Sequence, residues 1–126
     1  MMDDFRHFTV TDPFQRVWDV ELRWQQNAIS IRHADAVDCK YYLTSGGERR
    51  ELVVSLTHPD LLAVAAAAGR ELSDAWVIRL GALHAQALIG GWRDTDKTIA
   101  VASRAELTSY NAELEQRRAQ ALAAQR

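Results

Sequence analysis

The chain has 126 residues, of which 48% are hydrophobic and 25% charged, and its 15 basic and 17 acidic residues give a formal net charge of −2. These proportions are ordinary for a single globular domain with one core, so they exclude a fibrous or largely disordered chain. The small negative charge excludes a global basic field, and we expect neither nucleic acid nor a membrane surface as a partner.

The cysteine content and the first residues of the chain indicate the cellular compartment. Cys39 is the only cysteine, so the chain has neither an internal disulfide nor a thiolate cluster for a metal. The start, Met1-Met2-Asp3-Asp4, is acidic and lacks the basic and then apolar segments of a secretory signal. We expect a cytoplasmic protein that forms one domain over residues 1–126, with no cofactor and no metal.

The first half of the chain alternates in the manner of β-strands. Residues 7–11 have strand propensity and precede Asp12-Pro13, which favours a turn. From Trp18 to Trp24 the even positions are apolar and the odd positions charged, which is typical of a strand with one buried face.

The same apolar phase resumes after residue 28, which predicts a hairpin with its turn centred on Gln26-Asn27. The cross-strand pairs expected in this register are Trp24 with Ile29, Leu22 with Ile31, and Glu21 with Arg32. Large apolar pairs on one face and an opposite-charge pair on the other would suit a half-buried antiparallel hairpin.

Two further strands complete the predicted sheet. His33 and Asp35 interrupt the apolar phase, so a bend or turn is expected at 33–36, before a strand at 37–43. A tight turn centred on either Gly46-Gly47 or Gly47-Glu48 leads to a strand at 51–57.

Helical signals begin at His58. Pro59 suits the first turn of a helix, and Gly69 is a natural stop for it. A second helix, capped by Ser73 or Asp74, has an apolar stripe from 76 to 88 and is expected to end at 90–91.

The last third holds a short strand candidate and a third helix. Residues 98–101 have strand character, and Ser103 with Glu106 forms a capping box. The apolar stripe of the third helix weakens beyond Glu115, so residues 117–126 are expected to fray, to project or to pack in an oligomer. The order of elements predicts an α+β fold: an antiparallel β-meander of three to five strands, with about three helices, mostly in the C-terminal half, packed on one face.

Three groups of polar residues are candidates for a site. His33, Asp35 and Asp38 would share a metal or a proton if the strand continued, and would face water if they form a bend. His84 lies on the apolar side of the second helix, where its partner would be a tyrosine, a backbone carbonyl, Asp94 or Asp96. The third group is the loop after that helix, with Trp92, Arg93, Asp94 and Asp96, and these four residues together with His84 make up the ligand-binding hypothesis.

A fourth candidate is an interaction surface. Tyr42 and Val53 fall on the polar face of the predicted sheet, and Arg117 and Arg118 begin the weakly apolar tail. No catalytic or metal motif stands out. The sequence therefore favours a non-enzymatic module that binds a protein partner or a second copy of itself. The alternative is a small-ligand-binding protein or enzyme with its site near His84 and the 92–96 loop.

Overall fold

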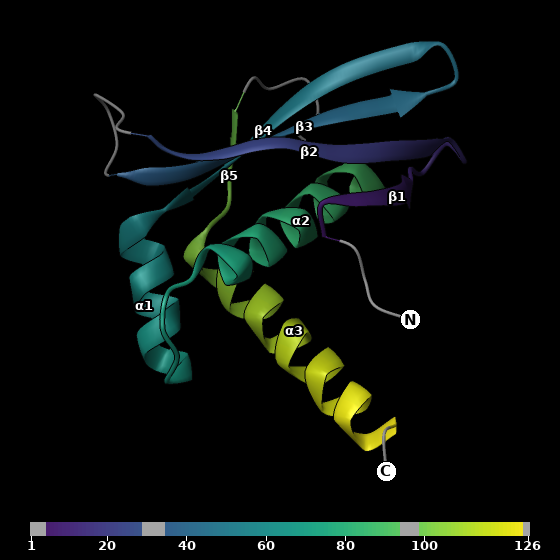
Figure 1. Ribbon diagram of the computed structural model, residues 1–126. Helices are drawn as coiled ribbons and strands as arrows, with labels where there is room; N and C mark the ends of the chain where they lie inside the picture. The colour runs from purple at the N-terminus through teal and green to yellow at the C-terminus, as the bar shows by residue number, and fades with distance from the viewer. Residues whose placement is uncertain (1–4, 29–34, 94–98, 125–126) are drawn as a thin grey trace.

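A computed structural model describes residues 5–28, 35–93 and 99–124, and shows a five-stranded sheet with helices on one face (Figure 1). The predicted α+β fold is confirmed. In chain order the elements are β1 (His7–Thr11), β2 (Val17–Ala28), β3 (Ala36–Ser45), β4 (Glu48–Thr57), α1 (His58–Ala68), α2 (Asp74–Gly91), β5 (Ile99–Val101) and α3 (Arg104–Ala124). We call the face that the helices cover the inner face, and the opposite one the outer face.

The strands lie in the sheet in the order in which they occur in the chain. β1 to β4 are antiparallel neighbours, and β5 returns after two helices to pair with β4 in parallel. Ser45 pairs with Glu48, which places the two-residue turn at Gly46-Gly47, the first of the two expected positions. Gly46 has a φ of 58°, a conformation that glycine adopts without strain.

The expected hairpin turn at residues 26–27 is wrong. β2 continues through these residues and pairs with β3 as far as position 28. The observed pairs are Glu21 with Tyr42, Leu22 with Tyr41, and Trp24 with Lys40. The expected partners at 29, 31 and 32 lie outside the described residues. Alternation predicts which residues share a face, but it does not distinguish a turn from a strand that continues against a distant partner.

A β-bulge in β2 explains why Trp24 leaves the apolar face that was expected for it. The register with β3 shifts between Leu22 and Trp24, so one extra residue, Arg23, is inserted there. Trp18 and Val20 before the bulge are fully buried, whereas Trp24 is 38% exposed and its ring lies 6.0 Å from the Lys40 amine. The bulge therefore moves a tryptophan to the outer face.

Helix α2 occupies the centre of the core, and eleven of its 18 residues are buried. Ser73 caps it by accepting a 3.2 Å hydrogen bond from the backbone N–H of Trp76. Gly90 and Gly91 belong to its last turn, and Trp92, with a φ of 50°, is the left-handed residue that ends the helix. The sequence pointed to the glycines because they adopt this conformation more easily.

Gly81 allows α2 to approach the sheet closely. A Cβ atom at this position would lie 3.0 Å from the Tyr41 hydroxyl and 3.2 Å from the Cys39 sulfur, both on β3. Cys39 and Tyr41 are themselves fully buried. The helix and the strand are therefore in direct contact, with no room for a side chain between them.

Asp12 ties the β1–β2 connection to the core. Its carboxylate accepts hydrogen bonds from the backbone N–H groups of Phe14 and Arg16, from the Arg16 guanidinium at 2.7 Å and from the Trp18 indole at 3.0 Å. Burial raises the pKa of this carboxyl, but the hydrogen bonds outweigh burial and lower it to about 2.

Of the remaining helices, α3 packs on α2, and α1 packs on α3 and against β4. α1 ends at Gly69 with a φ of 66°, as expected, and α3 begins with the expected capping box, in which Ser103 and Glu106 exchange hydrogen bonds of 3.1 and 3.0 Å. α3 continues to Ala124, and its exposed C-terminal half extends away from the sheet (Figure 1). None of the described helices is long and apolar enough to cross a lipid bilayer.

The contact at Gly81 predicts different effects on stability for the same substitution at two positions of α2. Alanine in place of glycine stabilises a helix interior by about 1 kcal/mol, and the last turn, where Gly90 lies, by less. At Gly90 the new Cβ would lie 3.8 Å from Val10, an ordinary contact, whereas at Gly81 it meets buried atoms. We expect Gly90→Ala to have a higher free energy of unfolding than the parent when unfolding in urea is measured. The free energy of unfolding of Gly81→Ala should be at least about 1 kcal/mol lower than that of Gly90→Ala, because the core is overpacked. Equal values for the two variants would contradict the close contact.

Burial of Cys39 predicts a thiol that does not react in the native state. Burial raises its pKa to about 12, and the neighbouring Asp38 charge acts in the same direction. We expect negligible labelling by an aromatic disulfide reagent without denaturant, and complete labelling of one thiol per chain in guanidinium. Rapid native labelling would show that β3 opens locally, contrary to the packing described above.

Candidate functional site

Four polar residues from α2, its C-terminal end and α3 come together around His84. The His84 imidazole is 2% exposed, and its Nδ1 atom is hydrogen-bonded to the Tyr110 hydroxyl at 2.8 Å. The Glu106 carboxylate lies 3.8 Å from the same nitrogen and accepts a 2.9 Å hydrogen bond from Arg93. We call these four residues the His84 cluster.

The electrostatics of the His84 cluster follow from burial and close charges. Burial raises the pKa of Glu106, but hydrogen bonds from Ser103 and Arg93, together with the charge of His84, lower it to about 2. Burial and the Glu106 charge raise the pKa of Tyr110 to about 12. At neutral pH the cluster therefore contains an ionised glutamate and a neutral tyrosine, each held by its neighbours.

The contacts of the His84 cluster link α2 to α3. Of the predicted ligand-binding residues, the structure brings His84 and Arg93 into one cluster, and it adds Tyr110 and Glu106, which the sequence analysis did not name as candidates. Asp94 and Asp96 lie outside the described residues. Because the imidazole is enclosed, a substrate would reach it only if α2 and α3 moved apart. The tyrosine partner matches one of the structural alternatives for His84.

Trp92 belongs to a different group of side chains. Its ring stacks on Trp18 with 5.7 Å between centroids, and the guanidinium groups of Arg16 and Arg50 lie 4.6 and 5.2 Å from its centroid. Phe14 approaches its edge. Trp92 therefore closes one end of the core against the β1–β2 connection, through aromatic and cation–π contacts.

The first predicted group, His33, Asp35 and Asp38, does not form a metal site among the residues described. His33 is outside the described ranges, Asp35 is exposed before β3, and Asp38 lies on β3 opposite Ser55. In the described part of the chain, no three His, Cys, Asp or Glu side chains lie close enough together to hold a metal ion.

The outer face of the sheet carries the predicted interface residues Tyr42 and Val53. Tyr42 lies beneath three cationic groups, of which the Arg49 guanidinium is 4.1 Å from its ring centroid. Val53 pairs with Ile99 on β5, where Ile99 is 49% and Val101 is 52% exposed. Together with Trp24, these four residues form what we call the outer apolar strip: Tyr42, Val53, Ile99, Val101 and Trp24.

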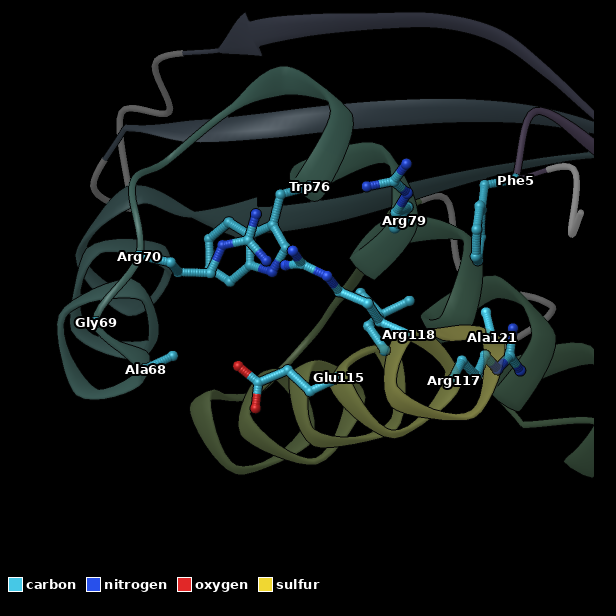
Figure 2. A pocket seen from close by; sticks show the side chains of 11 residues that line it. Phe5, Ala68, Gly69, Arg70, Trp76, Arg79, Glu115, Arg117, Arg118 and Ala121 are labelled. Carbon is cyan, nitrogen blue, oxygen red and sulfur yellow. The ribbon is translucent and has the colours of Figure 1, made fainter. Parts of the chain in front are cut away.

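A groove opens on the helical side of the molecule, and the other two predicted interface residues line it (Figure 2). It measures about 720 Å³ and lies between the end of α1, the first half of α2 and the second half of α3. Its charged lining residues are Arg70, Arg79, Glu115, Arg117 and Arg118, and its larger apolar ones are Phe5, Trp76 and Leu114. We call it the arginine groove.

Only part of the arginine groove could be predicted from the sequence. Arg117 and Arg118 stood out because they interrupt the apolar stripe of the last helix. Arg70 and Arg79 carried no such signal, since one follows a helix stop and the other occupies the polar side of α2. The four residues meet only because α1, α2 and α3 pack together, and no local pattern reports that packing.

Ionisation of Glu106 predicts a specific loss of stability in acid. Its folded-state pKa, about 2, lies below the unfolded value of 4.5. The stabilisation is therefore complete above pH 4.5 and is lost as the pH falls toward 2. Glu106→Gln keeps the cap geometry but removes the charge, so its free energy of unfolding should fall less between pH 5 and about 2.5 than that of the parent. Glu113→Gln, which alters the exposed pair with Arg117, is the control. A parent curve parallel to that of Glu106→Gln would contradict the assignment.

Comparison with known proteins identifies no relative. No protein-family model, no curated protein and no solved structure matches the chain.

Proposed function

We propose that the protein is a non-enzymatic binding module that associates with a second copy of itself through the outer face of its sheet. The observation that carries the proposal is the outer apolar strip, which no helix covers in the part of the chain that the structure describes. Antiparallel sheets often leave one face in water, but that face is then usually polar. Here a bulge adds Trp24 to it, and β5 adds Ile99 and Val101.

Charge supports a second copy as the occupant. The outer face carries acidic and basic residues in similar numbers: Asp19, Glu21 and Glu51 beside Arg23, Lys40 and Arg49. A face of mixed sign is complementary to itself when two copies are related by a twofold axis. A strongly acidic or basic partner would find no matching field there.

The enclosed His84 cluster favours binding over catalysis. Catalytic sites need several polar groups that reach a substrate together, and this group of polar residues has its histidine buried between helices. We further propose that the protein acts in the cytoplasm, which is supported by a single cysteine that is unpaired and buried.

The proposal predicts concentration-dependent dimers that substitutions on the outer face disrupt. Size-exclusion chromatography with light scattering would give the mass of the parent, of Ile99→Asp and of Tyr42→Ser. We expect each substitution to weaken the dimer by at least about tenfold, because a charge or a lost ring in a buried interface costs more than about 1.4 kcal/mol. Leu62→Asp is the matched control, since Leu62 is an equally exposed apolar residue on α1.

Two results would count against the proposal. A parent protein that stays monomeric at every concentration would overturn it. So would dimers that Leu62→Asp disrupts as strongly as Ile99→Asp, because the contact would then lie on the helical side. Circular dichroism of each variant would verify that the fold is retained.

A further inference from the structure

The arginine groove concentrates positive charge in a protein that is acidic overall. Four arginines and one glutamate line it, which leaves three net positive charges at a single place on a chain whose total is −2. A general preference for arginine in the sequence would scatter these residues over the surface. Like charges gathered around one depression repel one another, and an anion bound among them would relieve that repulsion.

Three of the four arginines are available to such an anion. Arg117 is paired with Glu113 at 3.2 Å, whereas Arg70, Arg79 and Arg118 have no ion-pair partner among the residues described. Arg70 donates one hydrogen bond, at 3.5 Å, to the backbone carbonyl of Glu71. Figure 2 shows Arg70 and Arg118 extending from different elements toward the same part of the groove.

Aromatic rings hold two of these guanidinium groups in place. The Arg70 guanidinium lies 4.7 Å from the centroid of the buried Trp76 ring, and the Arg79 guanidinium lies 5.8 Å from that of Phe5. Stacking fixes the plane of a guanidinium and leaves its edge N–H groups free to donate. Pairs of such N–H groups match the geometry of two phosphate oxygens.

The size and walls of the groove indicate how large the ligand is. A volume of about 720 Å³ lies within the range of about 300–1,000 Å³ that is usual for small-molecule sites. Phe5 and Leu114 give it an apolar wall beside the arginines. A long polyanion would require the basic track to continue, but acidic residues interrupt it: Glu71 follows Arg70, and Glu113 and Glu115 lie on α3.

We propose that the arginine groove binds a small phosphorylated molecule, with the phosphate held by Arg70 and Arg118 and an apolar moiety placed against Phe5 and Leu114. This site is separate from the proposed dimer face, which lies on the other side of the sheet. Binding and self-association can therefore fail or succeed independently.

The test is a titration of the full chain, followed by calorimetry and by the indole N–H signals of its tryptophans. The probes are inorganic phosphate, phenyl phosphate and hexaglutamate, all at low ionic strength. We expect phenyl phosphate to bind about tenfold more tightly than inorganic phosphate, because burying its ring adds an apolar contribution. The indole signal of Trp76 should shift because the ligand binds the guanidinium that is stacked on its ring, and that of Trp24 on the outer face should not.

Matched variants locate the binding. Arg70→Gln and Arg118→Gln should each weaken phenyl phosphate binding at least about tenfold, since a hydrogen bond to a charged group is lost. Arg49→Gln is the control, because Arg49 is also exposed and stacked on a ring, but lies on the outer face. It should leave the affinity unchanged.

Several results would overturn the proposal. They are an absence of binding by both phosphate probes, equal losses in Arg49→Gln and Arg118→Gln, or a shift of Trp24 in place of Trp76. Hexaglutamate binding more tightly than phenyl phosphate would instead assign the groove to an acidic peptide. Equal affinities for inorganic and phenyl phosphate would show that the groove does not bind an apolar moiety and is a site for inorganic anions only.

Discussion

Helix α2 touches the sheet at Gly81, and the layout of the rest of the molecule depends on that contact. Because the helix is pressed onto Tyr41 and Cys39, most of its surface is removed from water and has to be apolar. Where the sheet does not cover α2, α3 packs on it, and α1 packs in turn on α3, so all three helices lie on the inner face. The outer face is left without a helical layer among the described residues. The arginine groove lies where the same three helices diverge.

Those parts of the fold that depend on neighbours in sequence could be predicted. The Gly46-Gly47 turn, the stop at Gly69 and the capping box of Ser103 each involve residues within a few positions of one another. The hairpin at residues 26–27 failed for the opposite reason. Whether β2 turns there or continues depends on β3, and the inserted Arg23 reverses the alternation that the prediction extended beyond Trp24. A bulge leaves no clear mark in a single sequence.

The candidate surfaces, too, could be predicted only where they depend on a local pattern in the sequence. Tyr42 and Val53 could be assigned to the outer face because the strand period fixes it, and Arg117 and Arg118 could be singled out within one helix. The convergence of Arg70 and Arg79 with them could not be predicted, since it requires the relative positions of three helices. For His84, the sequence alone did not identify the hydrogen-bond partner. A tyrosine could be named as a type of partner, but only the packing of α2 on α3 identifies Tyr110.

The parallel pairing of β5 with β4 has a consequence for the order in which the chain is made. A ribosome completes β1 to β4 first. The backbone N–H and C=O groups on the free edge of β4 then have no β5 to pair with until the whole of α1 and α2 has been synthesised. An unpaired apolar edge of this kind readily joins other nascent chains. Native closure becomes possible only once β5 and the start of α3 have left the exit tunnel. Until then the edge of β4 has no strand beside it, so in a growing chain it is open to pairing with other polypeptides.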